Sequence, residues 1–216
     1  MREYAAWCDL VSRLHRFAPE GDGRLWWSAR RTPDLVPDAV TLDPDVSELD
    51  VLGRITNSPG ASVADSFATL DLTDQGFTVL EDATWVARPP GTRAHDEVAS
   101  TFAVVREKFP FAAWCRAWGG PEDVLPNGLR RASGVTVLGR DGAGGSADGG
   151  IVHRTEIGGK AVAGLWHVFG AWADVAAAAS HRHPEAWIVT YEHGADLDAA
   201  LASGFTAIGP LPVWRR

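Results

Sequence analysis

The stretch AWIVTYEHGADLDAALASGFTAIGPLPVW, residues 186–214, decides the fold, because it passes from a strand to a helix and back to strands with almost no loop between them. Residues 186–191 are an apolar run rich in β-branched and aromatic side chains, which predicts a buried strand. Residues 196–203 repeat apolar side chains at helical spacing, and Gly204 is typical of a helix C-terminus. Two short closing strands are expected at 206–208 and 211–214.

The segments before this stretch predict further strands and helices. FTVLEDATWVA, residues 77–87, reads as a strand that stops before Pro89-Pro90. Residues 95–118 repeat apolar side chains at helical spacing around Pro110, which predicts a long, interrupted helical region. Three strands and a helix are expected to follow, at 135–139, 151–157, 161–169 and 172–182.

Glycines separate these three strands. Gly158-Gly159 suits a two-residue hairpin turn. Residues 140–150, RDGAGGSADGG, lack apolar anchors and are interpreted as a mobile hairpin tip. A phosphate-binding loop is disfavoured, because no Gly-Lys-Ser/Thr follows the glycines.

The first 76 residues predict a mainly helical extension. An opening helix places one apolar face toward a partner, formed by Tyr4, Trp7, Cys8, Val11, Leu14 and Ala18. A short strand is expected at 39–42, and two more helices at 46–55 and 62–72. The stretch at 70–85 and the end of the chain both carry a Gly-Phe-Thr followed by a Trp, which fits either a shared helix-to-strand solution or a duplication.

The element order from 77 to 216, with Gly204-Phe205 closing the last helix, resembles the GNAT (acyl-CoA N-acyltransferase) superfamily. The resemblance implies an α/β (α+β) fold with a mixed, half-open β-sheet flanked by helices. It also implies two parts, an N-terminal extension at 1–76 and a GNAT-like domain at 77–216. The activity it implies is acyl-CoA-dependent transfer to an amine of a small molecule or peptide.

The resemblance further implies that acetyl-CoA or another acyl-CoA binds where the fourth strand of the family splays from the fifth. The positions that match in this chain are Val168, Phe169, Gly170 and Ala171. The family loop usually reads Gln/Arg-x-x-Gly-x-Gly/Ala, whereas only Gly170-Ala171 precede the helix here. No Lys or Arg occurs from 161 to 181, and the carboxylate of Asp174 would compete with a diphosphate for the helix N-terminus.

Catalytic candidates lie at the ends of the strands that would flank the acyl group. Either Glu192 or His193 is the candidate base, and Tyr191 is the candidate acid. Alternating strand faces make it unfavourable for Glu192 and His193 to serve one site. His167, near the end of strand 161–169, is a fourth candidate. The alternative role for the residues at 191–193 is capping of the last helix.

Composition and charge narrow the class of protein. The chain has 216 residues, 45% of them hydrophobic, which is enough for one large domain or two small ones. There is no apolar run long enough to cross a bilayer, so a cytoplasmic, non-membrane protein is expected. The net charge of −8 and dispersed basic residues disfavour a nucleic-acid partner. Cys8 and Cys115 are interpreted as reduced packing thiols.

Metal and hydrolase chemistry are disfavoured. His181 and His183 are two residues apart at a helix end and would point to different faces, and no third ligand has suitable spacing. The side chains of His153 and Glu156 are expected to point to opposite faces of one strand, so they would not act together. No Gly-x-Ser-x-Gly turn follows any strand.

Ten tryptophans support a second hypothesis. Those difficult to bury together are Trp26, Trp27, Trp166 and Trp187. They are expected to line a cleft that suits flat or cationic ligands. The alternative function is therefore a non-catalytic ligand- or partner-binding protein on a degenerate GNAT scaffold. A homodimer with tryptophans at its interface is a third possibility.

Overall fold

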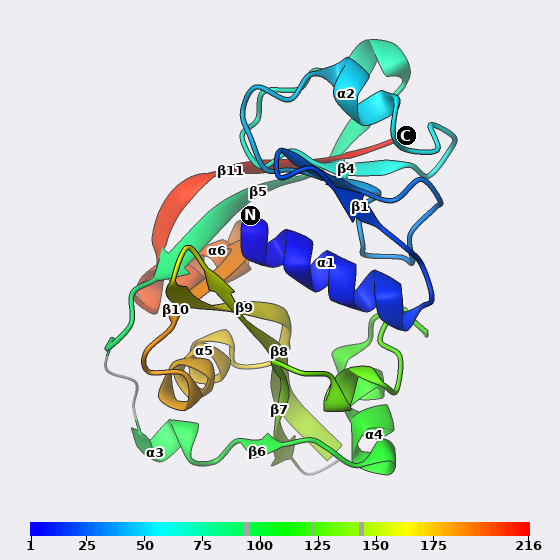
Figure 1. Cartoon of the computed structure of the whole chain (residues 1–216). Coiled ribbons are helices and arrows are strands. Elements are labelled where there is room, and N and C mark those ends of the chain that lie inside the picture. The colour runs from blue at the N-terminus through cyan, green and yellow to red at the C-terminus, as the bar shows by residue number, and fades with distance from the viewer. Residues whose placement is uncertain (93–95, 122, 143–144) are drawn as a thin grey trace. The chain divides into compact units, whose positions relative to one another are not determined.

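The computed structural model describes residues 1–92, 96–121, 123–142 and 145–216 (Figure 1). Its α-helices are α1 Arg2–Leu14, α2 Glu48–Leu52, α3 Asp96–Ala99, α4 Lys108–Trp118, α5 Trp172–Arg182 and α6 Gly194–Ala202. Two 3-10 turns are η1 Thr73–Gln75 and η2 Leu129–Arg131. The strands are β1 Glu20–Gly21, β2 Leu25–Trp27, β3 Ala39–Thr41, β4 Ser62–Ala64, β5 Thr78–Arg88, β6 Ala103–Val104, β7 Val135–Gly142, β8 Gly145–Ile157, β9 Lys160–Phe169, β10 Trp187–Glu192 and β11 Thr206–Arg215.

These elements form a mixed α+β fold with a large mixed β-sheet flanked by helices, as the sequence predicted. The chain divides into two compact units, and three strands have residues in both. Unit 1 comprises residues 1–85, 191–193 and 207–216, and unit 2 comprises residues 86–190 and 194–206. The expected domain division after residue 76 stays a prediction.

Unit 2 is built on strands in the order β10-β9-β8-β7-β6. β9 pairs with β10 in parallel, and the other neighbours are antiparallel. Two adjacent β8 residues show how this sheet is covered: a Cβ on Gly149 would meet Trp114 of α4, whereas one on Gly150 would meet Val175 of α5. Because successive strand residues face opposite ways, α4 and α5 cover opposite faces of the sheet (Figure 1).

The core of unit 2 explains the alanine-rich sequence of α5. Val175, Ala176, Ala178 and Ala179 are fully buried in one apolar cluster with residues of β8 and β9. Small side chains on the inner face let the helix lie close to the sheet, and alanine is also the strongest helix former. Trp172 opens the helix and makes an edge contact with Phe205, 5.2 Å between ring centroids.

Unit 1 has the strand order β1-β2-β3-β4-β11-β5. β3 and β4 are parallel, while β4 pairs antiparallel with the end of β11 through Val213, Trp214 and Arg215. Its apolar cluster joins β2, β3 and β4 to α2 and to the C-terminal strand β11. The last residues of the chain are therefore part of the same core as residues 25–77.

Several predicted elements are confirmed with small shifts in their ends. The opening helix is α1, the strand at 39–42 is β3, the helix at 46–55 is α2, and the strand at 77–87 is β5. The three strands, the helix at 172–182, the strand at 186–191 and the helix at 196–203 correspond to β7, β8, β9, α5, β10 and α6. Gly158 and Gly159 have φ of 58° and 73° in the expected turn.

Other predictions are wrong. The expected helix at 62–72 is absent: residues 62–64 form β4, with Val63 and Ala64 fully buried. The single helical region expected at 95–118 is divided into α3, β6 and α4 within its described part, residues 96–118. The two closing strands are one continuous strand, β11. Residues 140–142 and 145–150 lie in β7 and β8, so the expected hairpin tip is mainly strand, and residues 143–144 are outside the described part.

Candidate functional site

The N-terminus of α5 is the position where the sequence predicted an acyl-CoA diphosphate. Gly170 adopts φ of 79° and turns the chain from β9 into the helix. Ala171 is the N-cap residue and has no side chain that can accept a hydrogen bond from the first turn. The free N–H groups of this turn therefore need an acceptor from elsewhere in the chain.

Asp148 of β8 supplies an acceptor for one of these groups. The backbone N–H of Ala171 donates to Asp148 Oδ1 at 2.6 Å. The Asp148 carboxylate is buried, with the residue 8% exposed. A Cβ built on Gly170 would lie 2.3 Å from the same Oδ1 atom, which shows that the carboxylate fills the space beside the turn.

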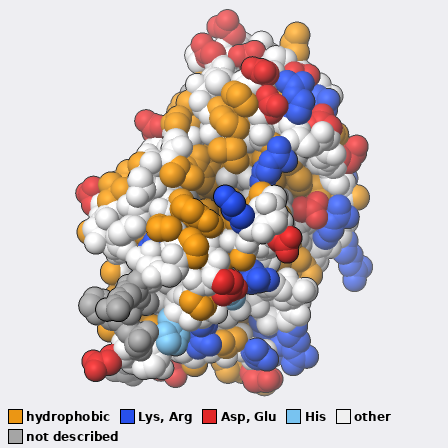
Figure 2. Space-filling view, turned by 60° about the vertical axis from the view of Figure 1, so that its left-hand side comes forward, with side chains coloured by type: hydrophobic (Ala, Val, Ile, Leu, Met, Phe, Trp, Pro, Cys, Tyr) orange, Lys and Arg blue, Asp and Glu red, His pale blue; other side chains and the backbone are white. Residues whose placement is uncertain are grey.

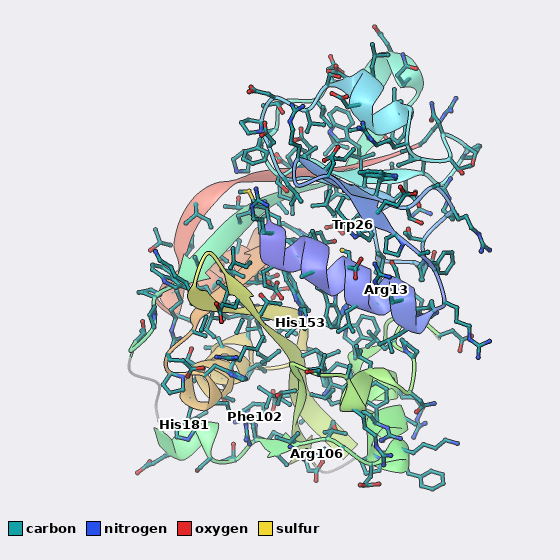
Figure 3. The ribbon with its side chains drawn as sticks, viewed as in Figure 1. Arg13, Trp26, Phe102, Arg106, His153 and His181 are labelled. Carbon is teal, nitrogen blue, oxygen red and sulfur yellow. The ribbon has the colours of Figure 1, made fainter. Side chains whose placement is uncertain are left out.

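Arg140 of β7 completes the network. Its Nε donates to Asp148 Oδ2 at 2.8 Å, and its Nη2 lies 2.8 Å both from that oxygen and from Asp174 Oδ2 in the first turn of α5. The guanidinium also lies over the ring of Phe102, 4.8 Å from the centroid. Phe102 is labelled in Figure 3. Two carboxylates and one guanidinium thus give the α5 N-terminus a negative balance.

The electrostatics agree with this geometry. Burial raises the pKa of Asp148, but the hydrogen bonds from Ala171 and Arg140 oppose it, and the net effect is a lowered pKa. The hydrogen bond to Asp148 raises the pKa of Arg140. Both groups are therefore charged at neutral pH.

The residues at this helix N-terminus do not fit a diphosphate. The Ala171 N–H is already bonded to Asp148, and Asp174 brings a second negative charge to the first turn. Arg140, the basic side chain of this network, is shared between the two carboxylates. An incoming dianion would meet like charges and would have to displace an ion pair.

Strand β9 is irregular at His167. Gly149 pairs with Phe169 but Ile151 pairs with Trp166, so His167 and Val168 lie opposite the single residue Gly150. His167 has φ of 54°, which is uncommon for a residue with a side chain. This β-bulge redirects the end of β9. The parallel ladder between β9 and β10 spans Val162–Gly164 and Trp187–Val189, before the bulge.

Four ring-bearing side chains of α4 and β9 lie together in what we call the aromatic wall, formed by Trp114, Trp118, His167 and Phe169. Trp118 contacts His167 edge-on with ring centroids 4.7 Å apart, and Trp114 contacts Phe169 at 5.2 Å. Trp114 is buried, whereas the other three are half-buried. Desolvation lowers the pKa of His167 to about 4, so the wall is uncharged at neutral pH.

Tyr191 belongs to a different cluster, in unit 1. Its hydroxyl lies 3.4 Å from that of Tyr4 on α1, and its ring makes edge contacts with Tyr4 and Trp85 at 5.3 and 5.5 Å. Burial raises the pKa of both tyrosines, so both hydroxyls stay protonated. Glu192 is half-buried and His193 is exposed.

The predicted site residues therefore fall into two groups. Tyr191, Glu192 and His193 are in unit 1, where Tyr191 contacts Tyr4 of the N-terminal helix. His167 and the expected cofactor residues Val168–Ala171 are in unit 2. Their catalytic and cofactor-binding roles stay predictions.

The four tryptophans proposed to line a cleft differ in how far their side chains are buried. Trp26 and Trp166 are buried, each 5% exposed, whereas Trp27 is half-buried under Arg54 and Trp187 is 37% exposed. The basic residues near Trp26 also have structural partners, since Arg31 pairs with Asp38 and Arg24 lies 3.7 Å from Asp43.

Among residues 1–92, 96–121, 123–142 and 145–216, no cluster of three His, Cys, Asp or Glu side chains is placed to hold a metal ion. Across the same ranges, no helix has the length and apolarity needed to span a membrane.

Sequence reasoning missed Asp148 and Arg140. Both lie in the glycine-rich run that was interpreted as a hairpin tip. The available signal was indirect: a helix that begins after Gly170-Ala171 without a capping side chain needs an acceptor from a distant residue. Tyr4 was assigned to the core, but the sequence did not pair it with Tyr191.

Comparison with known proteins supports the fold. No family model matches the chain, and no curated protein sequence does. A GCN5-related N-acetyltransferase from Kribbella flavida is similar in structure, with a TM-score of 0.62, 15% identity, and coverage of 98% of this chain and 95% of that one. A putative GNAT-family acetyltransferase from Novosphingobium aromaticivorans has a TM-score of 0.57 at 10% identity, covering 97% and 96%. A functionally unknown conserved protein from Staphylococcus epidermidis has a TM-score of 0.55 at 10% identity, covering 92% and 94%. These likenesses show a GNAT-like fold.

Proposed function

We propose that this chain is a non-catalytic ligand-binding protein on a GNAT-like fold, and that the N-terminus of α5 does not bind acyl-CoA. The observation that carries the proposal is the bond from the Ala171 N–H to Asp148. The helix end that would attract a diphosphate is neutralised by the chain's own carboxylate, which Arg140 holds in place.

The aromatic wall supports a ligand class. Trp118, His167 and Phe169 are half-buried and present ring surfaces without charge at neutral pH. Aromatic faces attract cations and stack on flat rings, whereas they offer little to a diphosphate. The ligand is therefore a flat or cationic organic molecule.

Calorimetric titration with acetyl-CoA and with benzyltrimethylammonium tests this function. The wild-type protein is expected to give no heat with about 1 mM acetyl-CoA, and to bind the aromatic cation with a Kd near or below that concentration. Trp118→Ala is expected to weaken cation binding about tenfold. Trp187→Ala is the matched control, because it removes an exposed tryptophan outside the wall. Micromolar acetyl-CoA binding by the wild type would refute the proposal.

Acyl-CoA-dependent N-acyltransfer to a small-molecule or peptide amine is the second candidate. The observation in its favour is the bulge at His167 together with the parallel ladder that ends at Gly164. These features resemble the splayed strands that the family uses for the pantetheine arm. In this reading Tyr191 is the acid and Glu192 or His193 the base, while the low pKa of His167 makes it a weak base.

Thiol release from acetyl-CoA with a panel of amines tests the second candidate. We expect no release above background. Release that Tyr191→Phe abolishes, while Tyr4→Phe preserves it, would favour the transferase, because Tyr4→Phe also removes the hydroxyl pair.

A further inference from the structure

One surface of unit 2 is strongly basic. It is formed by the segment before α4, the outer side of α4 and η2, and we call it the basic face; its members are Arg106, Lys108, Arg116, Arg130 and Arg131. A donated hydrogen bond from Arg130 to the Arg106 carbonyl joins its two parts. Glu107 lies 3.9 Å from Arg131, and both side chains are strongly exposed. Figure 3 labels Arg106.

The basic face is not neutralised within the described residues. Across residues 1–92, 96–121, 123–142 and 145–216, Arg106, Lys108 and Arg116 make no ion pair. The first turn of α4 carries Lys108 and no acidic residue, and Glu107 at the N-cap offsets only part of the positive charge there.

An apolar anchor stands on this face. Phe109 is 83% exposed, although it belongs to a helix whose inner face buries Phe111 and Trp114. At helical spacing, Phe109 and Arg116 lie on the same outer side of α4. An exposed aromatic ring among cations is the composition expected of a docking surface.

A surface of unit 1 has the opposite charge and its own apolar anchor. It surrounds α2 and η1, and we call it the acidic face; its members are Asp43, Asp45, Glu48, Asp50, Asp71 and Asp74. The N–H of Asp71 donates to Glu48 Oε1, which ties η1 to α2. Arg24 and Arg54 offset part of the charge. Leu49 is 83% exposed on α2. Figure 2 shows acidic side chains gathered at the top, where Figure 1 places α2.

We propose that the basic face of one molecule binds the acidic face of a second copy of this chain. Each face has an excess of charges of one sign, positive on the basic face and negative on the acidic face. Each also presents one strongly exposed apolar side chain, Phe109 or Leu49. The interface is heterologous, because two different surfaces meet. Opposite charges bring the faces together, and burial of Phe109 and Leu49 adds apolar contact.

The charge on these faces makes the association dependent on salt. Exposed ion pairs each contribute at most about 1 kcal/mol and are screened by salt. The complex therefore forms at high protein concentration and low ionic strength. This inference is independent of whether the α5 N-terminus binds a ligand.

Sedimentation velocity on the full chain tests the inference. We expect the weight-average mass to rise above 23.1 kDa with concentration in about 20 mM NaCl, and the Kd to increase at least tenfold in about 300 mM NaCl. Lys108→Glu with Arg116→Glu is expected to abolish association, as is Asp45→Lys with Asp74→Lys. Among the residues that the structure describes, these four side chains make no hydrogen bond or ion pair, so the variants are expected to fold.

Two further variants separate the specific interface from net charge. The chain that carries all four reversals keeps the net charge of −8 but leaves little opposite charge on either face, so it is expected to stay monomeric. Lys160→Glu with Arg215→Glu gives the same change in net charge as the basic-face variant, at positions outside both faces, and is expected to retain association. A monomeric wild type at about 0.5 mM in low salt would overturn the inference, and so would a fourfold variant that associates as strongly as the wild type.

Discussion

In helices α2 and α5 the N–H of the N-cap residue donates to a carboxylate, but the carboxylates come from different distances along the chain. In α2, Ser47 and Asp50 form a capping box, with the Ser47 N–H donating to Asp50 Oδ2 at 3.0 Å. In α5, the acceptor is Asp148, 23 residues before Ala171. The α2 cap forms with its own helix, whereas the α5 cap needs β7, β8 and β9 in place. The start of α5 is therefore a tertiary feature.

Replacing the two carboxylates should show the largest difference. Asp148→Ala is expected to lower the free energy of unfolding by about 3 kcal/mol, because it leaves the Ala171 N–H unbonded and Arg140 without one of its two carboxylates. Asp50→Ala, the matched change at α2, is expected to cost about 1 kcal/mol. Urea unfolding followed by tryptophan fluorescence measures both, and equal losses would remove the distinction between the caps.

Filling the space beside the distant carboxylate is the next largest effect. Gly170→Ala is expected to cost about 2 kcal/mol, because the new Cβ would meet Asp148 Oδ1 and the backbone also has positive φ. Gly158→Ala has a similar positive φ with no atom within 4 Å of the new Cβ, so about 1 kcal/mol is expected. The difference in urea midpoint isolates the steric contribution, and identical midpoints would argue that Asp148 is not packed there.

A smaller effect is expected from acid. The pKa of Asp148 is lowered in the folded protein, so its carboxylate stabilises the fold above the ordinary pKa of 3.8. That contribution is lost as the pH falls below 3.8 toward the folded-state pKa. The stability gap between wild type and Asp148→Asn should therefore be constant near pH 6 and narrow at about pH 3. A gap that widens in acid would contradict the sign of the shift.

The smallest effect should come from the arginine beside the local cap. Arg54 lies 3.5 Å from Asp50 and 3.2 Å from Asp22, with its side chain 33% exposed. Arg54→Gln is expected to cost about 0.5 kcal/mol, as for other surface ion pairs. Arg140→Gln, measured by the same unfolding experiment, should cost more, because Asp148 would lose its charged partner. A larger loss for Arg54→Gln than for Arg140→Gln would mean that the stronger ion pairs are those beside α2.

The elements that were predicted correctly from the sequence are those with a continuous apolar pattern. The helix at 172–182 has the predicted ends, because most of its residues are buried. The strand at 186–191, in which Ile188 and Thr190 are buried, is shifted by one residue. The helix at 62–72 failed because Val63, Phe67 and Leu70 mimic helical spacing. Here β4 pairs instead with β3 and β11, and Asp65 accepts the Leu70 N–H at 2.9 Å. Such pairing depends on residues far away in sequence.

The candidate site shows the same limit. The short loop before α5 and the absence of basic residues from 161 to 181 were visible in the sequence, and both pointed away from a diphosphate. The reason for that arrangement was not visible, because Asp148 reaches the helix from β8 across a hairpin. Glycines around Asp148 resembled a loose turn, although Gly149 and Gly150 are packed between α4 and α5.

The two cysteines lie in separate units, Cys8 on α1 in unit 1 and Cys115 on α4 in unit 2. Burial raises the pKa of both thiols, that of Cys115 to about 11. Since only the thiolate reacts with alkylating reagents, each cysteine reacts slowly until its own surroundings open. The labelling rate of each thiol therefore reports the local opening of its own unit in the unmodified protein. Comparing the two rates would show whether the two units open together or independently.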